Sequence, residues 1–328
     1  MFQAPPFDIT PEILNFVGAI DEFKGAWRAS RPLSADRLAA LEQAATGAGA
    51  AASLRIEGIE HPDDREIAAY ADVLGRIFRD HADMALTETL IDRLHRDLLP
   101  KSPHDSPHNE GLGYKSQSND LPSLDETGQP SGIGFTTATP LDTPRRMRDL
   151  VTWAHTELAT RAQHPLLTIA LFAIGFLEIM PYQAGNGRLS RVLVNLLLLR
   201  AGYAYVPYSA LDVVLENDKE AYFQSILATQ ADLPDGQPWL MVFFEALHMQ
   251  TLDLAFIIAQ DRSLTQALPE LSLQIMAQVA THGRVTVAEM AALTRTNRNT
   301  LKEHFRQLVE TRHLTLHGAG RGAWYGPA

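Results

Sequence analysis

Phe176-Leu-Glu-Ile-Met-Pro-Tyr-Gln-Ala-Gly-Asn-Gly-Arg-Leu-Ser-Arg191 is the stretch of this sequence that decides the fold. Gly185-Asn186-Gly187 predicts a tight turn that opens a helix running on through Leu199. The start of a helix presents free N–H groups with a partial positive charge, and Arg188 and Arg191, three residues apart, share one helix face above it. Amides, a helix dipole and two guanidinium groups predict a phosphate site. From spacing alone, a loop with two solvated arginines fits equally well.

The same stretch resembles the signature of the Fic family, whose pattern is His-Pro-Phe-x-Asp/Glu-Gly-Asn-Gly-Arg-x-x-Arg. Tyr182 is a conservative replacement for the Phe, and the identical positions are Pro181, Gly185, Asn186, Gly187, Arg188 and Arg191. The resemblance covers roughly residues 40–250. Residues 113–119 are similar to a loop that follows the family's early helices. Residues 132–140 are similar to the hairpin flap that holds a target protein. It implies an all-α Fic core that holds nucleotide α- and β-phosphates at residues 185–188 and a γ-phosphate at Arg191.

A second motif lies upstream, at Ser53-Leu-Arg-Ile-Glu57-Gly58. It is similar to the family's Ser/Thr-x-x-x-Glu-Gly/Asn inhibitory motif, which lies on a helix before the core and whose Glu pairs with the second arginine, here Arg191. A Glu before a Gly is by itself a common helix end. Two motifs in the expected order are more specific. The resemblance therefore implies an autoinhibited site with Ser53, Glu57 and Gly58 as regulatory residues.

Two positions depart from the family pattern. Met180 stands where the family has the His that takes a proton from the target hydroxyl; a thioether is no base, and losing a general base costs about 10²–10⁴ in rate. Ala184 replaces the acidic residue that helps hold Mg²⁺, and Gln183 is a poor ligand for that ion, so we expect no metal site in the turn. His104 and His108, in the loop region at 101–142, are the candidate substitute bases.

Residues 266–328 predict a winged helix-turn-helix: a helix at about 269–281, a capping box at Thr286-Val-Ala-Glu289, a helix at about 297–311, and two strands at 314–317 and 323–325. In the helix at about 297–311, Leu301, Phe305 and Leu308 fall on the face toward the core. The candidate DNA-binding residues are Arg298, Asn299, Lys302, Arg306 and, at the wing tip, Arg321. Use of this module for dimerisation or protein contact is the alternative.

Length and charge agree with this division. A chain of 328 residues with 45% apolar residues predicts about two folded domains. We expect an N-terminal helical segment at 1–100, a core at 101–255 that begins with a long loop at 101–142, and the winged helix at 266–328. Residues 282–328 hold seven Lys/Arg against three Asp/Glu, a balance of +4, which leaves −15 for residues 1–281 of a chain with net charge −11. The C-terminal module therefore carries a net positive charge, which suits a large anionic partner such as DNA.

No cysteine, no signal peptide and no long uninterrupted apolar segment is seen, so we expect a cytoplasmic protein without a membrane partner. Winged-helix modules often pair on two-fold sites, which is compatible with a homodimer. The first interpretation is a degenerate Fic-type protein that binds ATP or a related nucleotide, is impaired in AMP transfer, and has a DNA- or partner-binding module. The alternatives are an active protein adenylyltransferase, moving AMP from ATP to Ser, Thr or Tyr hydroxyls under restraint by Glu57, and an interaction scaffold with a vestigial anion site.

Overall fold

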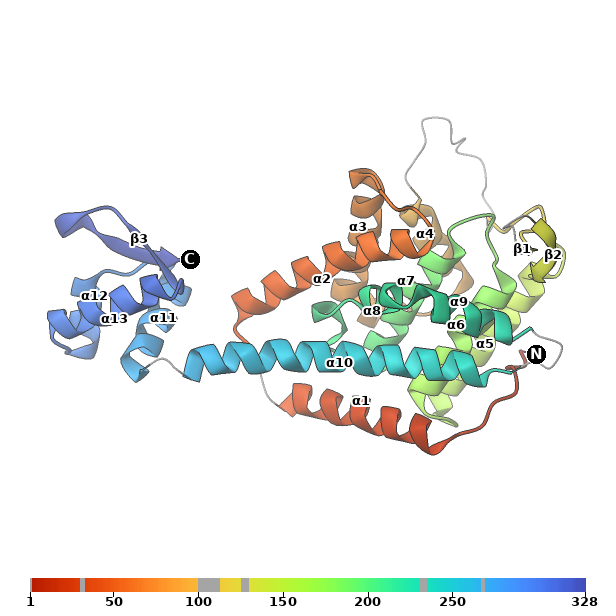
Figure 1. The fold of residues 1–328 in the computed structure, drawn as a ribbon, viewed down its shortest axis with the longest axis horizontal. Coiled ribbons are helices and arrows are strands. Elements are labelled where there is room, and N and C mark those ends of the chain that lie inside the picture. The colour runs from red at the N-terminus through yellow and green to blue at the C-terminus, as the bar shows by residue number, and fades with distance from the viewer. Residues whose placement is uncertain (1, 30–32, 100–112, 125–129, 231–234, 267–268) are drawn as a thin grey trace. The chain divides into compact units, whose positions relative to one another are not determined.

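The computed structural model describes residues 2–29, 33–99, 113–124, 130–230, 235–266 and 269–328. It divides into two compact units, Met1–Ala255 and Phe256–Ala328, each described here by itself (Figure 1). Helices dominate both units, and the described strands form two separate two-stranded sheets, so the predicted all-α class is confirmed. The helices predicted for residues 1–100 lie in the same unit as those that follow them.

The first unit is built mainly from helices, and the last part of α10, from Phe256 on, belongs to the second unit. Their bounds are α1 Pro11–Ala29, α2 Ala35–Ile56, α3 Asp64–Asp80, α4 Glu88–Leu98, α5 Thr143–Thr160, α6 Pro165–Ile179, α7 Asn186–Arg200, α8 Leu211–Asn217, α9 Lys219–Ala228 and α10 Gln237–Gln266, with 3-10 turns η1 His81–Asp83 and η2 Val206–Tyr208. Ser34 caps α2: its hydroxyl accepts the Arg37 N–H at 3.2 Å. α2 continues to Ile56, so Ser53 lies in its last turn and Glu57 directly after it.

α6 and α7 form the core of this unit, because almost every residue of both helices is buried. α5 packs on α6, while α2, α3 and α4 pack on α7. α6 is apolar on all sides, which is typical of a helix in the interior of a domain, and α7 buries its polar Ser190, Arg191 and Asn195 together with its leucines and valines. Their meeting point, the turn 180–185, is thus fixed by the best-packed part of the unit.

α10 is apolar enough over Gln237–Asp261, and long enough, to cross a membrane by length and composition alone, a segment that the sequence analysis does not single out. The packing of the helix also explains its apolar composition, since it buries Trp239, Leu240 and Phe244 in the first unit. The Trp239 indole N–H donates to the Ala170 carbonyl of α6 at 2.8 Å. The figure shows α10 running beside α1 along one side of this unit (Figure 1).

The predicted hairpin is present but is displaced along the chain. β1 Leu121–Leu124 pairs antiparallel with β2 Pro130–Phe135, so the hairpin ends before the expected 132–139 region is complete. Residues 136–138 leave the ladder because other groups bind their backbone. The Gln230 side chain bonds both backbone groups of Thr136 at 2.8 Å, and the Glu178 carbonyl accepts the Ala138 N–H at 3.2 Å.

The second unit has its helices and strands in the order predicted from the sequence: α11 Glu270–His282, α12 Val287–Thr294, α13 Arg298–Glu310, β3 Leu314–His317, η3 Gly320–Gly322 and β4 Trp324–Pro327. Thr286 and Glu289 form the expected capping box at the start of α12. Its small core contains the three α13 residues named from the sequence together with Ile275, Val279, Val285, Met290 and Leu314. A bridge between Val285 and Tyr325 ties β4 to the segment before α12.

Candidate functional site

The turn between α6 and α7 is held by its own asparagine. Asn186, the first residue of α7, accepts the Tyr182 N–H at 2.9 Å and donates to the Tyr182 carbonyl at 2.7 Å. Gly185, just before it, has a φ of 77°, in the left-handed region that favours glycine. Asn186 was expected to bind nucleotide; here its side chain shapes the turn instead, while its backbone lies at the helix start.

Residues from the 113–119 stretch support the same turn from outside. The Asn119 amide donates to the carbonyls of Met180 at 3.1 Å and Tyr182 at 2.8 Å. The Lys115 ammonium donates to the Ile179 carbonyl at 3.0 Å, and burial lowers its pKa to about 8. These bonds explain how Met180, a non-glycine residue, keeps a φ of 42°. The carbonyl groups at the end of α6 are therefore satisfied within the protein.

His95, on α4, lies behind the turn. Its ring stacks on Tyr182 with ring centres 3.7 Å apart and planes 10° from parallel. Its Nε2 lies 2.9 Å from the Ala184 carbonyl oxygen, which makes Nε2 the protonated nitrogen that donates. Burial lowers the pKa of His95, in agreement with a neutral ring. Tyr182 is fully buried, as expected for core packing, and His95 positions the turn.

The carboxylate of Glu57 occupies the amino end of α7. A Cβ placed on Gly187 would lie only 2.1 Å from Glu57 Oε1, so this glycine allows the carboxylate to approach the first helical turn. Arg191 Nη2 donates to the same Oε1 at 3.0 Å, which is the pairing that the upstream motif implies. An anion is thus held at the helix start, where the dipole and free N–H groups favour negative charge.

Arg191 is anchored by more than Glu57. Its side chain is 3% exposed, and its Nε donates to the Ser53 hydroxyl at 2.9 Å and to Asp212 Oδ1 at 3.1 Å. Nη2 also donates to the Ser53 carbonyl at 2.9 Å. Burial alone would lower the pKa of Arg191, but Glu57 and other neighbours, Asp212 among them, hold it above its usual value. The guanidinium therefore stays charged between two carboxylates.

Asp212 is a functional residue that the sequence analysis missed. It lies on α8 and is buried, and its Oδ1 also accepts the Tyr70 hydroxyl of α3 at 2.9 Å. Burial raises the pKa of Asp212, and the adjacent Arg191 opposes that rise. Its one signal in the sequence is an acidic residue flanked by apolar ones, Ala210-Leu-Asp-Val-Val-Leu215. A carboxylate in such a run needs a buried partner.

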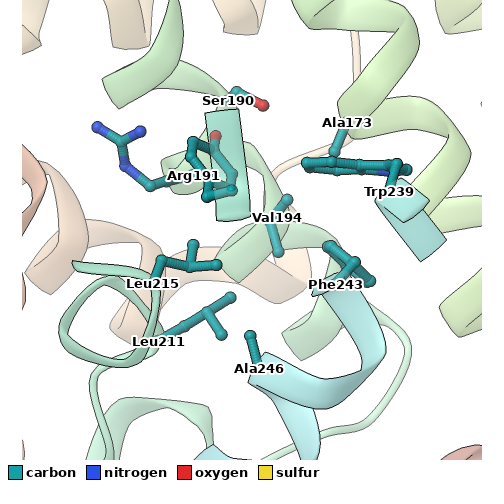
Figure 2. Close-up of a pocket in the computed structure, with 10 residues that line it drawn as sticks. Ala173, Ser190, Arg191, Val194, Leu211, Leu215, Trp239, Phe243 and Ala246 are labelled. Carbon is teal, nitrogen blue, oxygen red and sulfur yellow. The ribbon is translucent and has the colours of Figure 1, made fainter. Parts of the chain in front are cut away.

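Donors remain at the site beyond those already bonded. Within the described residues, Arg188 Nε and Arg191 Nη1 are buried and make no hydrogen bond. Below Arg191 lies a small cavity of about 20 Å³, enough for about one water molecule. Figure 2 shows its mainly apolar walls, with Arg191 and Val194 from α7, Leu215 from α8 and Trp239 and Phe243 from α10. The arrangement of these unused donors beside the amino end of α7 is of the kind that binds anions.

A metal ion has no carboxylate ligand in the turn. Ala184 offers only a methyl group and a carbonyl already bonded by His95, and Gln183 is exposed. Among the residues that the structure describes, no group of three or more His, Asp or Glu side chains is placed to hold a metal ion. The residues of the turn therefore do not fit Mg²⁺. The two loop histidines, His104 and His108, lie outside the described residues.

The candidate DNA-binding residues lie in the second unit. Arg298, Asn299 and Lys302 are exposed on α13. Arg306 is exposed too, but its guanidinium pairs with Glu303 at 2.5 Å and with Glu310 at 3.9 Å on the same helix. Arg321 lies in η3, and its side chain is outside the part that the structure describes. The free positive charge of α13 is therefore at its amino-terminal half.

Residues 85–198 match the sequence model of the Fic/DOC family. Protein adenylyltransferase Fic of Drosophila virilis is 27% identical over 172 residues, which cover 52% of this chain and 29% of that relative. The protein of the same name from Drosophila willistoni is 31% identical over 120 residues, covering 36% of this chain and 22% of the relative. This chain thus spans less than a third of these curated relatives.

Solved structures share the fold. A Fic family protein from Desulfovibrio desulfuricans G20 superposes with a TM-score of 0.61 and 20% identity, covering 100% of this chain and 98% of that chain. A Fic domain-containing signaling protein from Bacteroides thetaiotaomicron has a TM-score of 0.58 and 24% identity, covering 74% of this chain and 97% of that chain. At these identities the likeness concerns the fold alone.

Proposed function

This chain belongs to the Fic/DOC family through residues 85–198, and we propose that it binds an adenine nucleotide at the start of α7 without transferring AMP efficiently. The observation that supports binding most strongly is the Glu57 carboxylate held against Gly187 by Arg191. A site that already holds an anion beside two buried, unused guanidinium nitrogens suits a phosphate. The adenylyltransferase relatives favour ATP as the source of that phosphate.

The proposed loss of transfer rests on Met180 and Ala184. Transfer of AMP requires a base for the attacking hydroxyl, and the thioether of Met180 accepts no proton. His95 is the histidine that contacts the turn, and its Nε2–H is bonded to Ala184. Nucleotidyl transfer also relies on metal charge, for which the turn supplies no carboxylate. The site keeps the groups that bind phosphate and lacks those that move it.

Calorimetric titration of the full chain with ATP and ADP tests this proposal. Arg188→Ala is expected to weaken binding by about tenfold to a hundredfold, because a charge-assisted hydrogen bond contributes about 1.5–3 kcal/mol. Arg200→Ala is the matched control, since that arginine lies at the far end of α7 and bonds the carbonyls of His81 and Ala82. If neither the wild type nor any variant binds ATP or ADP, nucleotide binding is refuted and a scaffold with a vestigial site is favoured.

Active AMP transfer is the second candidate, and the likeness to protein adenylyltransferases favours it. In that case the target hydroxyl would come from a protein segment laid beside the β1–β2 hairpin, and Glu57 would restrain the site. This candidate needs a base from residues other than Met180. Transfer of label from α-labelled ATP to protein separates the two candidates.

For the second unit we propose DNA binding through α13. The support is the order of its elements and the exposed charge of Arg298 and Lys302, for which the described residues provide no ion pair, in an otherwise acidic chain. Phosphate contacts by such residues make affinity fall with salt, by about one unit of slope for each contact. Use of the unit for protein contact or dimerisation is the other outcome of the test.

The test is fluorescence anisotropy of the full chain with a random-sequence DNA duplex across a salt series. Arg298→Ala with Lys302→Ala is expected to weaken binding and lower the salt slope by about two. Arg306→Ala, whose charge is shared with Glu303 and Glu310, is the control and should change the slope less. A wild-type chain that fails to bind the duplex even at low salt would contradict the proposal.

A further inference from the structure

Arg191 is bound to two carboxylates that differ in how firmly they are placed. Glu57 follows the last turn of α2 and its side chain is 29% exposed, so an incoming ligand can displace it. Asp212 lies within α8, and its side chain is 3% exposed. Tyr70 and Arg191 both donate to Asp212 Oδ1, at 2.9 and 3.1 Å, which suits an ionised carboxylate that stays in place.

The charge near Arg191 is therefore balanced even when Glu57 leaves. Arg191 and Asp212 remain as a neutral pair, with Nε facing Asp212 and Ser53. An anion that binds at the Nη end must approach a guanidinium whose charge is already compensated, with a second carboxylate close behind it. In a buried site such like-charge repulsion is poorly screened.

The two ends of a polyphosphate would meet different surroundings. The turn amides, the amino end of α7 and Arg188 lie beside the displaceable Glu57. The nearby buried carboxylate of Asp92, on α4, is paired with Arg96. Arg191, three residues further along, carries the permanent Asp212. A phosphate at the turn therefore gains full attraction, whereas a further phosphate at Arg191 gains little.

From this arrangement, and resting on the proposed nucleotide site, we propose that Asp212 is a specificity-determining residue that makes the site favour nucleoside diphosphates over triphosphates. It acts by neutralising the guanidinium that a γ-phosphate would need. Glu57 limits access to the whole site, whereas Asp212 sets which nucleotide gains from that access. Removing Glu57 alone is then expected to improve ADP and ATP binding to a similar extent.

The experiment measures the ratio of ATP to ADP affinity by calorimetry in the wild type, Glu57→Gly, Asp212→Asn and the double variant. Asn keeps an oxygen that accepts from Arg191 and Tyr70 and removes only the charge. The ratio is expected to rise about threefold or more in Asp212→Asn, further in the double variant, and to stay near the wild-type value in Glu57→Gly. Tyr70→Phe, which removes a neutral bond to the same carboxylate, is the matched control and should leave the ratio unchanged.

A ratio that is unchanged or falls in both Asp212→Asn variants overturns the inference, since Asp212 would then be neutral or would orient Arg191 for the γ-phosphate. A second measurement needs no nucleotide: the rise in melting temperature that inorganic phosphate produces is expected to be larger in Asp212→Asn than in the wild type. If no variant binds ATP or ADP, the proposed function fails. The phosphate-induced shift still decides between a neutralising and a silent Asp212.

Discussion

Arg191→Ala is expected to destabilise the first unit by about 3–5 kcal/mol, because it leaves the buried Asp212 carboxylate without its charged partner. The guanidinium is also the point where α2, α7 and α8 meet, through Ser53, its own helix and Asp212. Denaturant unfolding followed by circular dichroism measures the change. Arg188→Ala is the matched control in the same helix, and a change below about 1 kcal/mol is expected there, since Arg188 has no ion pair among the described residues.

A compensating pair of substitutions tests the cause of this loss. Arg191→Met combined with Asp212→Leu removes both charges together, and replacing a buried ion pair by apolar residues is often neutral. We therefore expect the double variant to regain much of the stability that Arg191→Ala loses. If the double variant is as unstable as the single one, the loss comes from the hydrogen bonds to Ser53 and not from the unpaired carboxylate.

Glu57→Gly is expected to tighten binding of ATP and ADP by about tenfold or more. Its carboxylate occupies the amino end of α7 and binds Arg191 through a charge-assisted hydrogen bond, which a nucleotide phosphate must displace. The variant should remain folded, because Ser53 still contacts Arg191 and Arg55 still pairs with Glu216, with Nη2 and Oε2 2.7 Å apart. Calorimetry gives the affinities.

Glu57→Gln is the control for this prediction. Gln keeps the size of the side chain and loses its charge, so a smaller gain than with Gly is expected. Affinities that are the same in wild type, Gln and Gly variants would mean that Glu57 does not restrain the site, whatever its position in the structure.

The sequence predicted the helices and the position of the site because those features follow from local rules. Thr286 caps the helix that it was expected to cap, and the Gly185-Asn186-Gly187 turn opens α7 as its residues require. The resemblance of two motifs to the Fic family implied the pairing of Arg191 with Glu57, which the structure contains. Capping residues and turn glycines have strongly preferred positions, so a local sequence pattern is enough to predict where they lie.

The rest of the site depends on long-range packing that no local pattern contains. Asp212 and Tyr70 are 21 and 121 positions from Arg191, and they join it only because α3 and α8 pack around α2 and α7. The role of Asn186 in bonding Tyr182 was likewise not visible from spacing. The hairpin was placed too far along the chain because Gln230, from a distant helix end, binds Thr136.

A variant with the family's residue types restored at the two altered positions serves as a positive control for AMP transfer. Met180→His with Ala184→Asp returns the two residue types that the family pattern has at those positions. In the Glu57→Gly background, this variant shows whether the scaffold still supports transfer of AMP, so that a negative result with Met180 and Ala184 in place can be interpreted.

The most direct measurement is incubation of the Glu57→Gly protein with α-labelled ATP and Mg²⁺, alone and with a cell lysate, beside a reaction without the protein. The proposal that this chain binds nucleotide without transferring it predicts no label on the protein itself and none on lysate proteins above the control, while calorimetry of the same sample shows ATP bound. Label transferred by the variant would contradict it and would establish a base other than Met180.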